Sequence, residues 1–464
     1  MFSSLLNKGI KKLSFEILIT LINITFTKEG EMIFGEDENV IKNIATFLGN
    51  NKNDITLLGY GILLIKHITC VNSLVKQILH KYKIVDFFNE IYQKFLLNSD
   101  LMEDLILCLG HFINSRFSKN KDILCAVIII KQQLNKITSF ESILKYLYIL
   151  YNLVLYRDSI IYKKMIDENI HEKIMEIYPF EEDNYEQIKK NIKYNNINDV
   201  NIKENYTSEK DLQKLRLLII KILGKLISIE DDNYAQKIID SGISKFINKL
   251  LKSSDIKVIK NTFFCIHNIC CGTYGQIANL YDNNTISLSL LVAKNVYETL
   301  ISKNQFINNL SKKDFENALR EIDYAFCMLI TNSLYERLVP VIKYEDHIVI
   351  LILLEGFKFL EDNEKDNDLI SLIIRAIAKL LEYFKNNDGN KNISDINLVE
   401  FLEKKGFKEI LEKLQYNSDE NIMNNAETLF EDYFDNSSNN NSNNININDI
   451  IEDDEKVEDD EKDD

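Results

Sequence analysis

Cysteine and histidine side chains are the residues best suited to metal binding or catalysis, and four of them lie in one short stretch. They are Cys265, His267, Cys270 and Cys271. A zinc corner needs a spacing such as CxxC, which the chain lacks, and helix neighbours at i+2 and i+3 project in different directions. The seven cysteines of the chain are scattered through apolar runs. We therefore expect reduced core cysteines, as in cytosolic or nuclear proteins, and no metal site.

Sequence motifs of common enzyme active sites are absent. The chain contains no GxxxxGK[ST], GxGxxG, HExxH or GxSxG, which mark phosphate-binding loops, dinucleotide sites, zinc proteases and serine hydrolases. Carboxylate pairs are numerous, as in any acidic helical protein, and none stands out. We therefore expect no enzyme, no catalytic residue and no cofactor.

One arrangement of polar residues does recur along the chain. Apolar helical stretches at 15–25, 59–69, 103–113, 144–154, 215–225, 259–269 and 372–382 begin about 40 residues apart, with two longer gaps. Each ends in a polar residue near the same position, and these residues are Asn23, His67, His111, Asn152, Lys225, Asn268 and Lys379. The recurrence of this position indicates a repeated structural unit.

The elements that position these residues must be helices. The chain has 14 Gly and only two prolines, Pro179 and Pro340, whereas a multi-strand sheet needs turn residues every 8–12 positions or so. A period near 40–47 built from paired or tripled helices is typical of an armadillo or HEAT solenoid, in which stacking creates the core. Apolar runs such as Ile348–Leu354 are too short to span a membrane.

Charge and composition set the limits of the predicted solenoid. Two segments break the helical periodicity: 180–211, interpreted as a long low-complexity loop, and 435–464, an Asn-rich and acidic tail expected to be disordered. We therefore expect one all-α solenoid over 1–434. The net charge is −16, of which −8 lies between Glu452 and Asp464. This balance argues against nucleic acid or an anionic membrane as a partner, and favours a cationic one.

Three segments resemble one family more closely than the repeat class requires. NTFFCIHNICCGTYGQIANLYDNN (261–284) is similar to the third helix and following turn of an importin-α repeat. The sequence 402–434 resembles that family's last repeat, and 221–242 resembles a central one. The order of the segments also agrees. The resemblance covers almost all of 13–434 and implies a right-handed armadillo superhelix of about nine repeats.

The resemblance implies a nuclear import adaptor, with cytoplasm and nucleus as its locations. In that family, third helices line a concave groove in which Asn amides hold the backbone of an extended peptide. Aromatic residues one turn earlier accept the aliphatic stems of Lys or Arg, and carboxylates neutralise the head groups. The implied ligand is a basic nuclear localisation signal of a cargo protein.

The N-terminal half, which corresponds to the family's major peptide site, has lost most of its rings. Ile19, Leu63 and Leu107 stand where the family has Trp, and His67 and His111 stand at Asn places. The acidic position for the key lysine falls at Val71. We expect this site to be weak, and the residues that keep a matching side chain are Asn23, Tyr148 and Asn152.

The C-terminal half, which corresponds to the minor site, keeps more of the family's side chains. Two rings, one Asn, one cation and two carboxylates match family positions, although Lys225 and Met328 replace two further Asn residues. We expect this half to bind the basic peptide. The matching residues are Lys221, Asp231, Phe264, Asn268, Glu321 and Tyr324.

The family's other partners leave two interpretations open. Nothing before Leu13 resembles the Arg/Lys-rich segment that recruits an importin-β-type carrier, so either the gene model is truncated or the protein works without that carrier. The C-terminal repeat resembles the surface bound by the family's export receptor. The alternative to transport is an armadillo scaffold that holds another protein partner in its groove.

Overall fold

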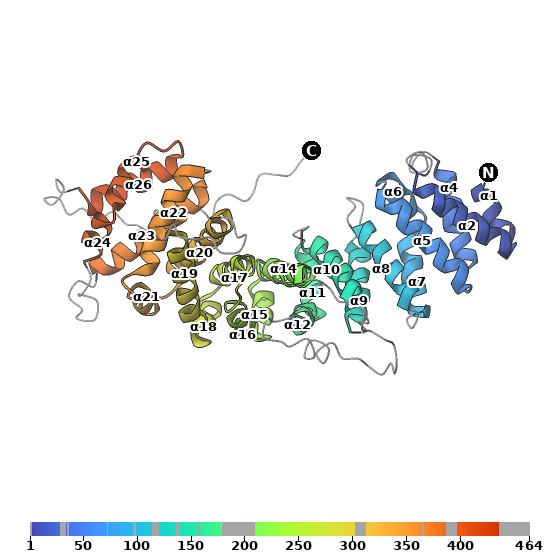
Figure 1. Ribbon diagram of the computed structural model, residues 1–464, viewed down its shortest axis with the longest axis horizontal. Coiled ribbons are helices and arrows are strands. Elements are labelled where there is room, and N and C mark those ends of the chain that lie inside the picture. The colour runs from blue at the N-terminus through green and yellow to red at the C-terminus, as the bar shows by residue number, and fades with distance from the viewer. Residues whose placement is uncertain are drawn as a thin grey trace. The chain divides into compact units, whose positions relative to one another are not determined.

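Helices form all the regular structure in the described part of the chain. The computed structural model describes residues 2–27, 34, 37–71, 73–95, 99–113, 120–135, 140–155, 158–178, 209–301, 312–363, 366–386 and 397–435, and no strand occurs in these ranges (Figure 1). The prediction of an all-α fold is therefore confirmed.

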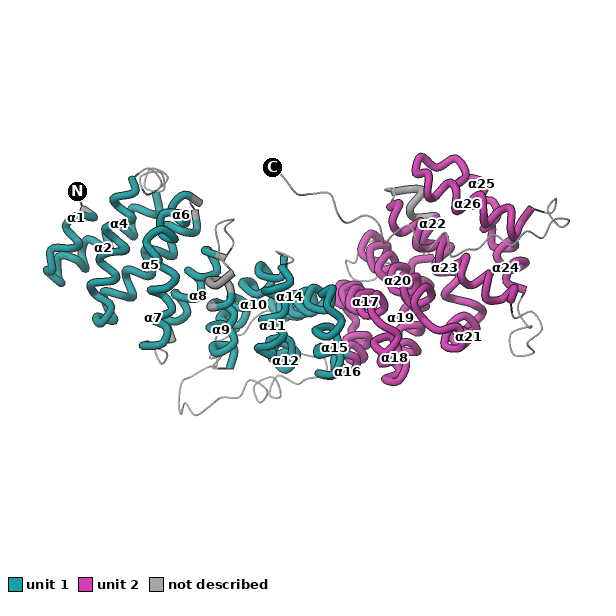
Figure 2. The backbone as a smooth tube through the Cα atoms, turned by 180° about the vertical axis from the view of Figure 1, so that it is seen from behind, with its two compact units in different colours: residues 1–243 teal, residues 244–464 magenta. Residues whose placement is uncertain are grey.

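The chain divides into two compact units, 1–243 and 244–464, shown in teal and magenta in Figure 2. The sequence does not indicate a boundary at residue 243, because the predicted helical repeats continue across it. The helices of the first unit are α1 (Phe2–Leu5), η1 (Leu6–Lys8, a 3-10 helix), α2 (Lys11–Thr25), α4 (Glu38–Asn50), α5 (Ile55–Val71), α6 (Ser73–Lys81), α7 (Ile84–Phe95), α8 (Ser99–Ile113), α9 (Asn120–Leu134), α10 (Phe140–Leu155), α11 (Ser159–Asp167), α12 (Ile170–Glu176), α14 (Glu209–Ile227) and α15 (Asp232–Asp240).

The second unit contains the remaining helices, which begin at the unit boundary. They are α16 (Ile243–Leu250), α17 (Ile256–Cys270), α18 (Tyr274–Asp282), α19 (Thr285–Ile301), α20 (Lys312–Asn332), α21 (Tyr335–Ile342), α22 (Ile348–Asn363), α23 (Asn367–Asn386), α24 (Leu398–Lys404), α25 (Phe407–Leu414) and α26 (Glu420–Tyr433).

One long helix from each repeat packs against the equivalent helix of the next repeat, and we call these the ladder helices. In the first unit α2, α5, α8, α10 and α14 pack in chain order, and in the second α17, α20, α23 and α26 do so. All seven apolar stretches singled out in the sequence lie within ladder helices. The predicted helical repeats are therefore confirmed, and each repeat is completed by further helices between successive ladder helices.

Left-handed residues mark the junction between the first two helices of many repeats. Lys83, Asn169, Gly242, Asn284 and Gly406 all have φ between 54° and 92°, and each lies between two consecutive helices. Glycine and asparagine tolerate this conformation better than other residues. The recurrence of one backbone conformation at one place is the structural counterpart of the sequence period.

The predicted interruptions of the solenoid fall mostly outside the described residues. The segment 179–208 and everything after Asp435 are not described. The C-terminal edge of the predicted loop needs correction, because residues 209–211 belong to α14. Asp211 accepts a hydrogen bond of 2.9 Å from Lys214 one turn later, a pairing that favours an early start of the helix.

Candidate peptide-binding faces

The ladder helices expose the same positions in both units. Pairs of residues one turn apart are exposed or half-buried in each helix, and we call the surface that they form the ladder face. The pairs are Ile19/Asn23, Leu63/His67, Leu107/His111, Tyr148/Asn152, Lys221/Lys225, Phe264/Asn268, Tyr324/Met328 and Arg375/Lys379. Helical geometry places such i, i+4 pairs on one side of a helix. The predicted site residues on these helices thus lie outside the packed core.

The positions just before the first member of each pair form the core of the stack. Leu18, Ile62, Ile106, Leu147, Ile220, Phe263, Asp323 and Ile374 are at most 1% exposed. Seven of the eight are apolar, as burial requires. Burial of its apolar side therefore fixes the rotation of each ladder helix, and this rotation determines which residues form the ladder face.

Helix α17 is held in register by strong signals at both of its ends. Asp255 caps its start by accepting a hydrogen bond of 2.8 Å from the backbone N–H of Lys257. After Cys270, Thr273 and Gln276 form a capping box that starts α18. A side chain at Gly272 would place its Cβ against the Gln276 carboxamide, so this tight turn requires glycine. The helix and following turn predicted for 261–284 are present, and α18 begins directly after the turn.

Three aromatic rings gather where α17 meets α20 in the second unit. The rings of His267 and Tyr324 stack with centroids 5.3 Å apart, and the ring of Phe264 lies edge-on to His267 at 6.4 Å. Burial lowers the pKa of His267 to about 4. His267 is therefore neutral at physiological pH and contributes an aromatic surface, not a charge.

Carboxylates flank this aromatic cluster. The Tyr324 hydroxyl donates to Asp366 at 3.0 Å, and Arg320 pairs with the same carboxylate. Burial, followed by the charge of Asp366, raises the pKa of Tyr324. Glu321 lies half-buried one turn before Tyr324, and its charge, after burial, contributes to raising the pKa of Cys265 to about 12. This effect places Glu321 beside α17, so the second unit combines rings, an amide and carboxylates on one face.

The first unit brings a different set of predicted residues together on α10 and α14. Tyr148 is 49% exposed on α10, with Asn152 one turn later. The Lys221 ammonium of α14 lies 5.8 Å from the centre of the Tyr151 ring of α10. Asn23 is exposed on α2, which α5 and α8 separate from α10 in the packing order. Asn23 therefore does not share a site with Tyr148.

Asp231 lies at the start of α15 and is already engaged. Its side chain accepts a hydrogen bond of 3.1 Å from the backbone of Asn233 and pairs with Lys163 of α11 at 2.7 Å. The hydrogen bond from Lys163 lowers the pKa of Asp231. A basic ligand would have to displace Lys163 to reach this carboxylate.

Comparisons with known proteins identify the fold and nothing finer. No protein-family model and no curated protein sequence matches the chain. A structure of beta-catenin, from a study of its interaction with cadherin, matches with a TM-score of 0.62 and 10% identity, covering 92% of this chain and 74% of that one. A crystal structure of an engineered protein matches with a TM-score of 0.61 and 15% identity, covering 93% and 87%. The fold is that of an armadillo-repeat protein.

Other armadillo structures match shorter parts of the chain. One designed armadillo repeat protein is 19% identical, with a TM-score of 0.43, over 65% of this chain and 97% of that chain. Since no sequence comparison matches, the importin-α assignment made from the residues stays a hypothesis.

His67 and His111, which stand at positions where the importin-α family has Asn, contact neighbouring repeats. The ring of His67 packs edge-on against Phe26 with centroids 4.8 Å apart, and His111 Nδ1 lies 3.2 Å from Thr69 Oγ1. Burial lowers the pKa of His111 to about 4. These residues therefore link repeats as neutral side chains.

Lys379, at the equivalent position of α23, also has a structural contact. Its ammonium donates to the carbonyls of Thr331 and Ser333, at 2.6 and 3.1 Å. These carbonyls lie at the end of α20, where the helix leaves acceptors without partners. The recurring polar position thus serves repeat packing in some repeats, which the sequence pattern alone did not distinguish from ligand binding.

Residues that the sequence analysis missed lie beside those it named. Asp366, which holds Tyr324, also accepts a hydrogen bond of 3.2 Å from the backbone of Leu369 at the start of α23. Asp before a helical run is a readable N-cap signal. Tyr151 lies one turn after Tyr148 on α10, and the i, i+3 spacing of the two tyrosines was the available signal.

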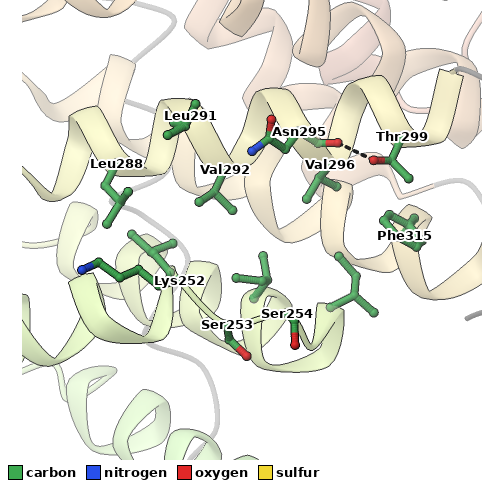
Figure 3. A pocket seen from close by; sticks show the side chains of 13 residues that line it. Lys252, Ser253, Ser254, Leu288, Leu291, Val292, Asn295, Val296, Thr299 and Phe315 are labelled. Atoms are coloured by element: carbon green, nitrogen blue, oxygen red, sulfur yellow. Dashed lines mark hydrogen bonds between the residues drawn. The ribbon is translucent and has the colours of Figure 1, made fainter. Parts of the chain in front are cut away.

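A separate hollow of about 400 Å³ lies away from the ladder face of the second unit. Figure 3 shows its apolar wall on α19, facing the Ser253–Ser254 connection between α16 and α17. The α19 residues that line it include Leu288, Leu291, Val292, Asn295, Val296 and Thr299. Lys252 is the one charged residue in the lining, which also includes the polar residues Ser253, Ser254, Asn295 and Thr299.

Two searches of the described residues were negative. In the ranges given above, no cluster of three His, Cys, Asp or Glu side chains is arranged to hold a metal ion. Within the same ranges no helix combines the length and apolar character needed to cross a bilayer.

Proposed function

We propose that this protein is a binding scaffold that holds an extended segment of a partner protein on the ladder face of its second unit. The observation that carries the proposal is the grouping of Phe264, His267 and Tyr324 beside Asn268 and Glu321 across α17 and α20. Beta-catenin, which has the same fold at 10% identity, interacts with cadherin, and this use of the fold supports a partner-binding role.

The chemistry of the face favours a lysine- or arginine-rich segment. The Asn268 amide can donate to and accept from a peptide backbone. The exposed edges of Phe264 and Tyr324 suit the aliphatic stem of a long cationic side chain, and each cation–ring contact contributes about 0.5–2 kcal/mol. Glu321 supplies negative charge nearby. Several such weak contacts at helical spacing select an extended cationic chain over a folded surface.

In its finer form, the proposal is that the bound segment is a basic nuclear localisation signal. The protein then acts as an importin-α-like import adaptor that moves between cytoplasm and nucleus, with an importin-β-type carrier and an export receptor as further partners. The support is the resemblance of 261–284 and 402–434 to that family. The alternative is a scaffold for a partner outside transport, and the loss of rings at Ile19, Leu63 and Leu107 favours it.

A direct test is the titration of a fluorescent Lys/Arg-rich peptide, followed by anisotropy. We expect Phe264→Ala to weaken binding about tenfold, because one ring contact is lost. Tyr416→Ala is the matched control, since Tyr416 is a surface aromatic that is 89% exposed outside the ladder face. Equal affinity of the wild-type protein and Phe264→Ala would show that the ladder face of the second unit is not the binding site.

Asp231→Asn tests the role of the remaining predicted carboxylate. Asparagine preserves the helix cap while removing the charge. If Asp231 receives a basic side chain of the ligand, affinity falls with no change in the thermal midpoint. Unchanged affinity assigns Asp231 to the ion pair with Lys163 alone.

A pull-down of the tagged protein distinguishes transport from scaffolding. A transport adaptor releases cargo when a competing Lys/Arg-rich peptide is added, and it co-purifies with an importin-β-type carrier. Stable association with one cytoskeletal or membrane complex that the peptide does not displace would overturn the transport proposal.

A further inference from the structure

Helix α14 carries a row of lysines on its ladder face. Lys210, Lys214, Lys221 and Lys225 are separated by four, seven and four residues, with Leu217 between the two pairs. This spacing places all five side chains on one side of the helix. Lys210, Lys214 and Lys221 are exposed, whereas Leu217 and Lys225 are half-buried. We call this surface the lysine stripe.

The stripe is not required for the stability of α14. The buried side of the helix is mostly apolar, with Leu215, Ile219, Ile222 and Leu226 at most 3% exposed, and it also includes Arg216 at 5%. Lysines four residues apart repel one another and destabilise a helix by about 0.2–0.5 kcal/mol per pair. Asp211 pairs with Lys214 at the start of the helix. A cationic row in a chain of net charge −16 therefore needs another explanation.

Neighbouring α10 adds aromatic surface to the stripe. The Lys221 ammonium lies over the Tyr151 ring, and Tyr148 is half exposed on the same helix face. The nearby carboxylates of Glu141 and Glu103 both pair with Lys145. The surface therefore alternates cations with tyrosine rings and one leucine, and Asn152 provides an amide beside them.

We propose that the lysine stripe and the adjacent tyrosines of α10 bind an acidic segment of a partner protein. Charge complementarity selects Asp and Glu side chains. The stripe is about 22 Å long, which is the length of about seven extended residues. Leu217 and the tyrosines accept an apolar side chain, so the segment carries acidic residues on both sides of one apolar residue. This preference is opposite to that proposed for the second unit.

An acidic peptide fits the stripe better than nucleic acid does. The row is a single line of cations on a strongly acidic protein, whereas nucleic-acid sites neutralise many phosphates with clustered Lys and Arg. The half-buried Leu217 offers an apolar contact that suits a leucine or phenylalanine side chain. An amide such as that of Asn152 matches a peptide backbone.

The experiment is a titration of the full-length protein with a fluorescent peptide that has acidic pairs flanking one leucine. We expect binding that weakens as salt is added, because exposed charges are screened. The double variant Lys214→Glu/Lys221→Glu should bind this peptide roughly tenfold more weakly, since two favourable exposed pairs become repulsive. Replacing the peptide's leucine with serine should also weaken binding.

The control is Lys245→Glu/Lys249→Glu, which reverses two exposed lysines of α16 and should leave affinity unchanged. Equal weakening by both double variants would overturn the proposal, because only net charge would matter. Equally tight binding of a single-stranded oligonucleotide would overturn it too, since the stripe would then be a general polyanion surface. Failure of the acidic peptide to bind the wild-type protein would also overturn the proposal.

Two single variants separate this inference from the function proposed for the second unit. The single variant Lys214→Glu should retain its affinity for the Lys/Arg-rich peptide, and Phe264→Ala should retain its affinity for the acidic one. Circular dichroism should show both variants folded, because the changed side chains lie outside the core.

Discussion

The ladder faces on α10–α14 and on α17–α20 occupy equivalent positions of the armadillo repeat but differ in chemistry. In the first unit the face carries Lys221 over Tyr151, and in the second it carries His267 stacked on Tyr324. The positions just before the face residues are buried in both units. The repeat therefore fixes which positions point outward, and the side chains placed there determine the kind of ligand.

The comparison also shows one departure from the shared core. At the position just before each ladder-face pair, the other ladder helices from α2 to α23 bury an apolar residue. Helix α20 buries Asp323 there. One of its carboxylate oxygens has no hydrogen-bond partner among the described residues. The carboxylate packs against Gly356 of α22, where a side chain would collide with it. The second unit thus has a buried carboxylate at a position where the ladder helices of the first unit carry only apolar residues.

The largest expected effect is a difference in unfolding free energy between alanine variants of two adjacent phenylalanines of α17. Phe263 is fully buried and packs against Phe326 with ring centroids 6.2 Å apart. Phe263→Ala should lower the free energy of unfolding by about 3–5 kcal/mol. Phe264→Ala, on the half-exposed face, should cost far less stability while losing peptide affinity. Chemical denaturation of both variants tests the assigned register, and a reversed order of the two losses would refute it.

Acid should destabilise the first unit through His171. This side chain of α12 is 2% exposed, and burial lowers its pKa to about 4. The unfolded chain takes up a proton near the ordinary pKa of 6.5, so stability is lost as pH falls from that value towards 4. His171→Phe should recover up to about 3 kcal/mol at low pH.

The measurement for His171→Phe is the denaturation midpoint as a function of pH. A stability gain that is constant across pH would contradict the argument, because it would reflect better packing and not the removed titration.

Asp323 should give the opposite pH dependence in the second unit. Burial, and then the charge of Glu355, raise its pKa well above the ordinary 3.8. The carboxyl is protonated in the fold but ionises in the unfolded chain, so its contribution to stability is lost as pH rises above 3.8. Asp323→Asn should therefore stabilise the protein at neutral pH by about 1–2 kcal/mol.

Denaturation of Asp323→Asn at acidic and neutral pH checks this sign. The gain should disappear at acidic pH, where wild type is protonated in both states. A loss of stability at neutral pH would show that the ionised carboxylate has a stabilising partner.

The smallest expected effect comes from transferring the chemistry of one face to the other. Lys221→Phe/Lys225→Asn gives α14 the side chains of Phe264 and Asn268. It should weaken acidic-peptide binding and add a second, weaker site for the Lys/Arg-rich peptide, with a gain of about threefold. Calorimetric titration measures both changes. No change with either peptide would show that neighbouring helices, and not these two positions, determine preference.

The sequence predicted the repeats because apolar periodicity and stacking leave little choice. It also predicted α17 and the glycine turn after it, but not α18, although Thr273 and Gln276 form a readable capping box. Side-chain pairing between repeats could not be predicted, since the partners lie about 40–70 residues apart: Lys163 with Asp231, Tyr324 with Asp366. The Asp231 carboxylate was interpreted as a ligand contact for this reason.

The lysine stripe was visible in the sequence only in part. Lys221 and Lys225 each stand at a family position, and the family pattern does not connect them with Lys210 and Lys214. The ligand preference proposed for the stripe also depends on the tyrosines of α10, which precede it in the sequence by about 60–70 residues. Packing of ladder helices supplies that contact.

Photo-crosslinking of a Lys/Arg-rich peptide tests the central claim most directly. A photoreactive group at the centre of the peptide should attach to α17 or α20, near Phe264 and Tyr324, as located by mass spectrometry of the digested protein. Excess unlabelled peptide should abolish the product, and the acidic peptide should not. Attachment to α10 or α14 instead, at the same peptide concentration, would contradict the assignment of the two faces.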